Sequence, residues 1–287
     1  GWGDGLMTPR PRFPIHLCQP DSKKSCAACC GIYNFKENGR RAVMRRLRRN
    51  TAILEQGGRE TVQERFASHA QRWRHRDNGD AKRFQTIFNC EFVGFLDAEH
   101  RRVGCLLHPA LHEGQDWRDC SFYGRELCDG HFCPSYLSLT EDEQAFVVET
   151  LDDWYLYGLV ITDLDLVKGV YRHLSDRLGQ AVPRTWLHHP SVRSALQPFW
   201  RWKVTWPYRR DGFDWFGKYL FIGDRYEEMR LPYELLGSRP SPYHPILLAL
   251  GSVFRSLEEL RDAERLIETA LERAERAFSE DISPETP

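Results

Sequence analysis

The sequence predicts a mainly α fold in which an irregular cysteine-rich part is followed by a helical part. All nine cysteines of the 287 residues lie between Cys18 and Cys133. In the second half, apolar residues recur every three to four positions, which is the spacing of one helix face. The composition is that of a globular protein, with 41% hydrophobic and 28% charged residues and a net charge of −1. It excludes a disordered tail, a coiled-coil rod and a collagen-like chain.

Residues 1–20 are rich in proline and are predicted to form an extended arm. Residues 1–16 contain no apolar run that could serve as the core of a signal peptide. The longest apolar runs, 156–161 and 246–250, are too short to span a membrane. We therefore expect a cytoplasmic protein with no membrane segment. In that reducing compartment, clustered cysteines serve as metal ligands or redox groups more often than as disulfides.

Residues 21–137 form the predicted cysteine-rich part, which contains a basic helical insert at 36–89. The insert has fourteen Arg or Lys against six Asp or Glu, a net charge of about +8. Its apolar positions are sparse but fit two helices. These positions are Val43, Leu47, Ile53 and Leu54 for the first helix, and Val62, Phe66 and Trp73 for the second.

Residues 138–287 form the predicted helical part. Thr140 and Glu143 fit a capping box, which satisfies free backbone N–H groups at a helix start. Apolar residues then continue at helical spacing as far as Tyr155. Two further helices are predicted over 162–178 and 191–202, the first ended by Gly179 and the second opened by Pro190.

The clearest helix is predicted near the end of the chain. Ser256 and Glu259 fit a second capping box. The apolar stripe that follows consists of Leu260, Ala263, Leu266, Ile267, Ala270, Leu271 and Ala274. Because no flexible linker separates the two parts, we expect them to share a core.

The cysteine spacing points to metal chemistry. Cys26-x-x-Cys29 is a spacing that lets two thiolates of one turn reach one metal ion, and Cys30 starts in a different direction. Cys18 has no partner at ligand spacing, so we set it aside. The eight candidate ligands are Cys26, Cys29, Cys30, Cys90, Cys105, Cys120, Cys128 and Cys133. Eight thiolates are enough for two four-ligand sites, and such soft ligands select zinc, iron–sulfur clusters or Cu(I).

The same residues carry a resemblance. The chain resembles the YkgJ-like CxxCxxCC cysteine-cluster family, described as zinc- or iron-chelating domains. The matching pieces are Cys26-Ala-Ala-Cys29-Cys30-Gly31, Cys90 with Leu96-Asp97, Gly104-Cys105-Leu-Leu-His108-Pro109, Arg118-Asp-Cys120, and Cys128 and Cys133. They cover roughly residues 22–135. The resemblance implies that the eight cysteines are metal ligands, and it implies no reaction.

Two cofactors remain open. The number of thiolates and the pair Cys133-Pro134 favour an iron–sulfur cluster, such as [4Fe–4S]. The plain CxxC spacing favours zinc, as do three histidines among the cysteines that could replace a thiolate. These histidines are His108, His112 and His131. Four nearby carboxylates could act as acid or base at an open metal position, namely Glu113, Asp116, Asp119 and Asp129.

Two classes of function follow. One is a metal-cluster protein with a redox or protein-modifying activity, which requires a metal with an open position. The other is a structural zinc-stapled module that binds a protein or nucleic acid without catalysis. The arginine-rich run at 40–49 and the ten aromatics of 199–221 could contact nucleic acid. The near-zero net charge makes nucleic acid the weaker expectation, and a protein partner stays open. We expect the arginines to be solvated or to pair with the acidic segment 141–165, and the aromatics to pack in a core.

Overall fold

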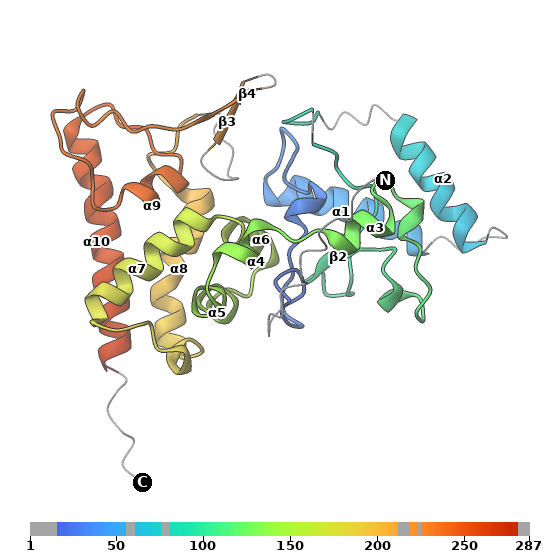
Figure 1. The fold of residues 1–287 in the computed structure, drawn as a ribbon, viewed down its shortest axis with the longest axis horizontal. Coiled ribbons are helices and arrows are strands. Elements are labelled where there is room, and N and C mark those ends of the chain that lie inside the picture. Colours follow the sequence, from blue (N-terminus) through green and yellow to red (C-terminus); the bar gives the residue numbers. More distant parts are fainter. Residues whose placement is uncertain are drawn as a thin grey trace, which may run out of the picture.

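The structure is a computed structural model, and it describes residues 16–55, 61–75, 81–85, 87–211, 219–222 and 225–280. It is mainly α, as predicted. Figure 1 shows an elongated molecule with α1–α3 at one end, α7–α10 at the other, and α4–α6 between them. The α-helices are α1 (Arg40–Glu55), α2 (Val62–His75), α3 (Gly124–Gly130), α4 (Pro134–Ser138), α5 (Glu141–Thr150), α6 (Trp154–Ile161), α7 (Leu164–Leu178), α8 (Pro190–Thr205), α9 (His244–Ala249) and α10 (Leu257–Glu280).

Two small antiparallel sheets accompany the helices among the described residues. The first pairs β1 (Val93–Phe95) with β2 (Val103–Cys105), and the second pairs β3 (Tyr219–Ile222) with β4 (Arg225–Glu228). Short 3₁₀ turns complete the fold: η1 (Ala28–Cys30), η2 (Pro109–Leu111), η3 (Arg118–Cys120) and η4 (Arg184–Trp186).

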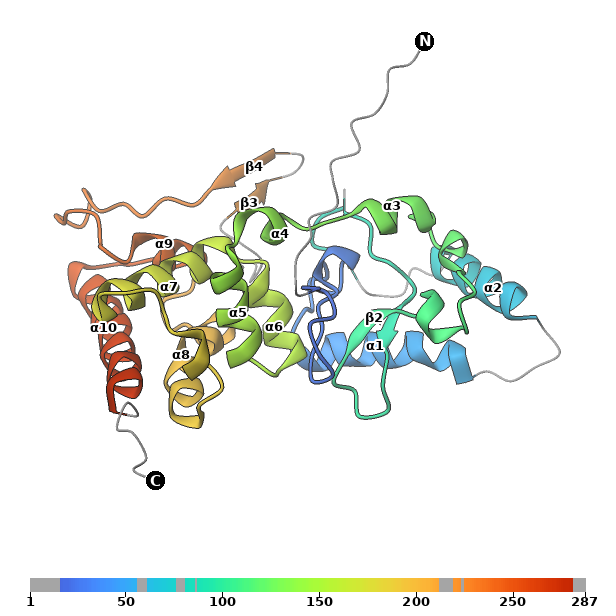
Figure 2. The ribbon, with the colours of Figure 1, turned by 60° about the horizontal axis from the view of Figure 1, so that its bottom comes forward.

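The two helices predicted in the basic insert are present as α1 and α2. Helix α1 buries Val43, Leu47 and Ile53 and packs against β1, whose partner strand β2 lies beside α1 in Figure 2. Helix α2 buries Phe66 in a small separate core with Phe92 and other apolar side chains. The cysteine-rich part therefore has a limited apolar core of its own.

The helix predicted to run on from the Thr140 capping box is interrupted. The capping box itself is present at the start of α5. Helix α5 ends at Thr150, and Asp153 starts α6 by accepting a hydrogen bond from the backbone N–H of Leu156 at 2.8 Å. The prediction of one helix through Tyr155 was wrong, because an aspartate that caps a new helix competes locally with continued helix.

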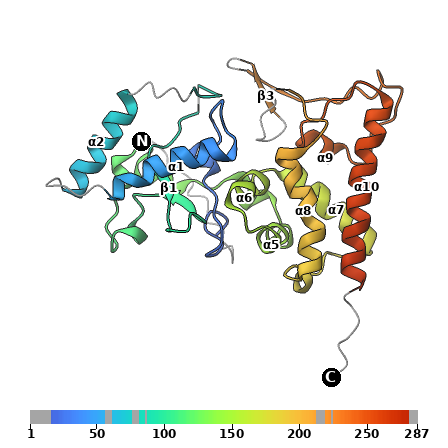
Figure 3. The same ribbon diagram turned by 180° about the vertical axis from the view of Figure 1, so that it is seen from behind.

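The other predicted helices are present as α7, α8 and α10. Gly179 ends α7 in the left-handed region, with φ = 65°. Ser256 accepts from the backbone N–H of Glu259 before α10, but the Glu259 carboxylate accepts from Arg255 rather than completing the box. Leu266 of the predicted stripe is 40% exposed, whereas the rest of the stripe is buried. Helices α8 and α10 pack side by side (Figure 3).

The two parts share one apolar core. It extends from Leu17 and Val43 in the cysteine-rich part to Leu271 in α10. Tyrosines tie the parts together through hydrogen bonds to backbone carbonyls. Tyr33 donates to Tyr155 O at 2.8 Å, and Tyr157 donates to Leu17 O at 2.8 Å. The cysteine-rich part is thus anchored on α6.

The arginine-rich run lies on α1. Arg40 pairs with Asp153 of the acidic segment, as expected, but Arg45 and Arg46 bond to Glu37 instead. Of the aromatic segment, Phe199, Trp200 and Trp206 are buried in the core as expected. Residues 212–218 of that segment lie outside the described residues. No helix among the described residues is long and apolar enough to cross a membrane.

Candidate metal centre

A tight turn brings Cys18 beside Cys26. The Asp21 carboxylate accepts hydrogen bonds from the backbone N–H groups of Lys23 and Lys24, which reverses the chain. The Cys26 N–H then donates to the Cys18 carbonyl at 2.9 Å. Cys18 therefore lies at the cysteine cluster, although sequence spacing alone set it aside. The Pro-Asp pair at 20–21 is the turn signal that could have indicated this.

A second close approach joins the η1 turn to residues 88–90. The Cys90 N–H donates to the Cys30 carbonyl at 2.9 Å. Gly31 has φ = 86°, and a Cβ there would lie 2.9 Å from Asn89 Cα. Only glycine fits this contact without displacement, so Gly31 allows Cys30 and Cys90 to meet across 60 positions of sequence.

Three other cysteines come from different elements. Cys105 ends β2, where it pairs with Val93 of β1. Cys128 lies on α3 and is exposed. Cys133 is the N-cap residue of α4 and is buried. No disulfide links the nine cysteines, all of which are among the described residues.

Electrostatic interactions connect eight of the thiols to one another, with Cys30 between two groups. In the first group, burial and then the Cys133 thiol raise the pKa of Cys18 to about 11. Burial, and then Cys18, raise the pKa of Cys26 well above its usual range. The hydrogen bond between Cys29 and Cys133 lowers the pKa of Cys133 to about 6 and raises that of Cys29. Backbone N–H groups at the start of α4 also favour the Cys133 thiolate.

The second group consists of Cys30, Cys90, Cys105 and Cys128. Burial raises the pKa of Cys30, and Cys105 and Cys128 add to this increase. Burial and then Cys30 raise the pKa of Cys90. Burial raises the pKa of Cys105 to about 11, against a lowering hydrogen bond from the backbone of Leu107. Cys30 also interacts with Cys18, Cys26 and Cys29, so the electrostatic interactions do not separate the two groups.

Cys120 has no electrostatic interaction with another thiol among the described residues. Burial raises its pKa, and the Asp119 carboxylate adds to this increase. The side chain packs at the edge of the small core around Phe66, as do those of Cys90 and Cys105. Electrostatic interactions thus link Cys18 to seven of the eight predicted ligands.

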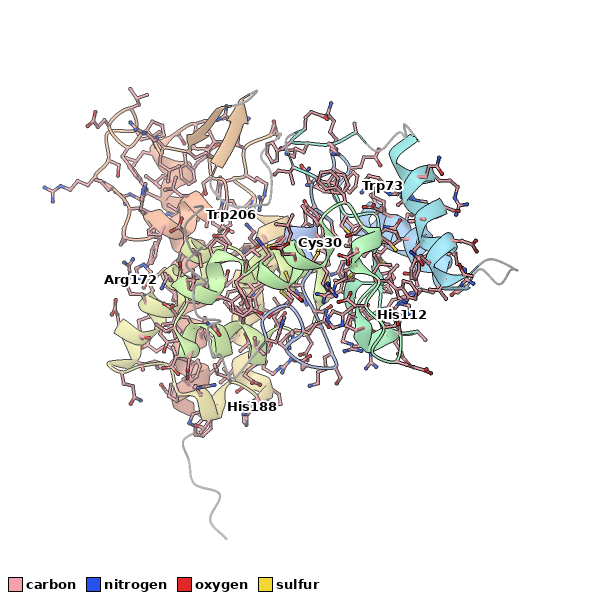
Figure 4. All side chains as sticks on the ribbon, turned by 45° about the vertical axis from the view of Figure 1, so that its right-hand side comes forward. Cys30, Trp73, His112, Arg172, His188 and Trp206 are labelled. Atoms are coloured by element: carbon pink, nitrogen blue, oxygen red, sulfur yellow. The ribbon has the colours of Figure 1, made fainter. Side chains whose placement is uncertain are left out.

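The histidines near the cysteines are engaged elsewhere or exposed. The His108 ring accepts from the backbone N–H of Ala110, which caps its own 3₁₀ turn. The His112 ring contacts Leu106 O at 2.7 Å and packs edge-on against Phe66. Figure 4 labels His112 and Cys30 on this half of the molecule. His131 follows α3 and is exposed. The His108 and His112 rings each keep a second nitrogen, so both histidines stay available as ligands beside the thiols.

The carboxylates near the cysteines form ion pairs and backbone hydrogen bonds with the surrounding segments. Buried Arg118 pairs with Asp116 at 2.6 Å and with Asp129 at 2.5 Å. The Asp119 carboxylate accepts from the backbone N–H of Arg125 in α3. Through these bonds η3 and α3 are clamped together, which positions Cys128. Sequence reasoning missed this clamp, since it predicted an acid or base. Glu113 has φ = 53° in a turn.

The thiols fit a metal by chemistry more than by their arrangement. Among the described residues, no three Cys, His, Asp or Glu side chains surround one point in the geometry of a metal site. Each group nevertheless offers four sulfur donors, some buried and some exposed, which is a donor set for zinc or iron–sulfur. Metal binding commonly closes such a set as it orders the chain.

Comparison with known proteins adds no relative: the chain matches no family model, no curated protein and no solved structure. The assignment of function therefore depends on the cysteines themselves.

Proposed function

We propose that this chain is a metal-cluster-binding protein with two adjacent four-cysteine sites. The observation that carries the proposal is the presence of eight unlinked thiols, from six separate segments, that interact electrostatically with one another. The assignment of four thiols to each of two sites is part of the proposal. The first site would use Cys18, Cys26, Cys29 and Cys133, and the second Cys30, Cys90, Cys105 and Cys128. This set takes Cys18 in place of Cys120. It departs from the YkgJ-like resemblance at Cys120 and shares the other seven ligands. We extend the zinc- or iron-chelating character of that family to this chain as part of the proposal.

The division between Cys29 and Cys30 has a geometric basis. Both lie in η1, and successive side chains of a 3₁₀ turn point about 120° apart. Two neighbouring cysteines in such a turn cannot easily serve one small ion, but they can serve two adjacent sites.

An iron–sulfur cluster such as [4Fe–4S] is the first candidate cofactor. All-thiolate donor sets suit it, and the eight cysteines supply two such sets. Bound there, the cluster would supply electron transfer or a redox step. The chain's own residues would hold it: the N–H groups of α4 favour the Cys133 thiolate, and Arg118 places positive charge near Cys105 and Cys128.

The second candidate is a structural zinc module without catalysis. It is favoured by the limited apolar core of the cysteine-rich part, which two zinc ions would staple. Such a module would present its surface to a protein partner. Both candidates require the same eight thiolates, so one experiment separates them.

The test is anaerobic purification of the full chain, followed by an absorption spectrum and analysis of iron, sulfide and zinc. A brown protein with iron and sulfide in equal amounts supports the cluster. A colourless protein with about two zinc ions supports the staple. Absence of both metals would overturn the proposal.

Single variants test the two-site arrangement. Cys133→Ser and Cys105→Ser should each lose about half of the bound metal, since each removes one ligand from a different site. Cys18→Ser should behave like Cys133→Ser. Cys120→Ser is the matched control and should keep its full metal content. If Cys120→Ser loses metal and Cys18→Ser does not, the ligand set is wrong.

A further inference from the structure

A small cavity lies beside the second cysteine group, between α1 and α2. Its volume is about 20 Å³, and its lining includes Cys30, Cys90, Asn50, Trp73 and Asn89. A cavity needs about 10–15 Å³ of this kind of space to hold one water molecule, provided that the water finds two to four polar partners. This cavity meets the first condition. Figure 4 labels Cys30 and Trp73, which come from η1 and α2.

Two of the lining residues carry buried polar atoms that have no hydrogen-bond partner among the described residues. One is Asn50 Oδ1, on a side chain that is 6% exposed, and the other is Trp73 Nε1. Asn50 Nδ2 donates to Val93 O at 2.9 Å, which fixes the amide orientation and leaves Oδ1 as the acceptor. Trp73 Nε1–H is a donor only.

The Trp73 N–H donor and the Asn50 carbonyl acceptor together indicate which kind of molecule the cavity can hold. A small anion would accept from Trp73 and lie near Arg46 and Arg49, but it would meet the carbonyl oxygen of Asn50. A cation would bind Asn50 but would meet the Trp73 N–H and buried Arg46, which also lines the cavity. A neutral molecule of the size of water satisfies both, because it accepts one hydrogen bond and donates two.

We propose that one buried water molecule links Trp73 and Asn50 to the thiols of the second cysteine group. The water accepts from Trp73 Nε1–H, donates to Asn50 Oδ1, and donates its second proton to the sulfur edge formed by Cys30 and Cys90. These three partners meet the second condition for a buried water. The water ties α1 and α2 to the metal-binding turn.

The consequence for metal binding rests on the proposed function. Groups that hydrogen-bond to metal ligands orient them, and losing such a group typically costs 10- to 100-fold in metal affinity. The water would orient the sulfur lone pairs of Cys30 or Cys90 in this way. Trp73 is then a positioning residue that acts through the water and does not touch the metal.

A high-resolution crystal structure of the full chain tests the water directly. We expect a water within hydrogen-bond distance of both Trp73 Nε1 and Asn50 Oδ1, and its loss in Trp73→Phe. Trp73→Phe removes the donor but keeps the aromatic contact with Phe88. A structure in which the site holds no water, or in which Trp73 and Asn50 bond to protein groups instead, would overturn the proposal.

Zinc titration of the metal-free chain tests the coupling to the thiols. Trp73→Phe should bind zinc at the second site about tenfold more weakly. Trp186→Phe, in η4 of the helical part, is the matched control and should bind as the parent chain does. Equal affinity in both variants would remove the link to the thiols. A parent chain that binds no zinc or iron would overturn the proposed function, while the crystal structure would still decide the water.

Discussion

The two halves of this molecule hold their shape by different means. In the helical half, apolar stripes of α7, α8 and α10 interlock, and side-chain caps satisfy the helix starts. In the cysteine-rich half, the chain crosses itself at short turns, and buried polar side chains bond to backbone groups. Asn34, for example, donates to the carbonyls of Phe84 and Ile87.

This difference indicates that a bound metal would stabilise mainly the cysteine-rich half. Eight thiols lie in the half with the smaller core, and desolvation keeps most of them protonated, as the raised pKa values of Cys26, Cys30 and Cys90 show. Metal binding would replace those protons and cross-link six segments. The helical half has no cysteine and needs no such link.

Metal removal should cause the largest difference in stability between the two halves. Structural zinc contributes on the order of 10 kcal/mol to the folding of small domains. A chelator added to the loaded protein should therefore greatly accelerate amide exchange in β1, β2 and η1, while α7 and α10 stay protected. Hydrogen exchange with mass spectrometry measures this. Equal acceleration of amide exchange in both halves would show that the metal does not stabilise one half more than the other.

Breaking the buried ion pair of the helical half should have the next largest effect. Lys203 Nζ lies 2.7 Å from Asp163 Oδ2, and both side chains are almost fully buried. Lys203→Met should lower the free energy of unfolding by about 3–5 kcal/mol, because it leaves a buried carboxylate without its partner. Urea denaturation measures the loss.

The control for that variant is Lys168→Met, which breaks an ion pair with Glu143 at 2.8 Å on the same half. The Lys168 side chain is 42% exposed, so this loss should stay below about 1 kcal/mol. Neither variant should change the bound metal. Loss of metal from Lys203→Met would show that metal binding depends on the stability of the helical half.

The Gly31 contact should have a moderate effect, confined to the cysteine-rich half. Gly31→Ala forces a side chain into the left-handed region and against Asn89, at a cost of about 1–3 kcal/mol. We expect lower stability and weaker metal binding at the second site, measured by zinc titration. Gly39→Ala, where nothing lies within 4 Å of an added Cβ, should bind zinc normally. Normal binding by Gly31→Ala would refute the contact.

The smallest effect concerns pH in the helical half. Hydrogen bonds from Tyr243 and then from Arg177 lower the pKa of Glu268 below its usual 4.5. A lowered carboxyl pKa stabilises the fold at pH values above the unfolded pKa, and this contribution is lost as the pH falls through the folded value. Stability measured between pH 6 and pH 3 should therefore decline less in Glu268→Gln than in the parent. Exposed Glu272→Gln should follow the parent curve.

Much of the helical half could be predicted because its signals are local. The Thr140 capping box, Gly179 and the stripe from Leu260 to Ala274 each act within one or two turns. The missed break before α6 had a local signal too, since Asp153 is a good N-cap residue. It was hidden by apolar residues that continue at helical spacing on both sides.

The cysteine site could be predicted only in part. Spacing indicated that Cys26, Cys29 and Cys30 belong to a metal site, and the count indicated two sites. Spacing could not show that Cys18 returns to Cys26 through a turn, or that Cys90 meets Cys30 at the η1 turn. These positions depend on contacts between residues far apart in the chain.

By itself, the sequence determined the mainly α class, the caps and stripes of the helices, and the confinement of sulfur chemistry to the first half. These features depend on backbone hydrogen bonds and side-chain periodicity over a few residues, so their signals are local in the sequence. Only the tertiary structure decided which thiols stand together. That choice depends on the Gly31 contact, the Cys18–Cys26 hydrogen bond and the Arg118 clamp, each of which joins segments that no local pattern relates.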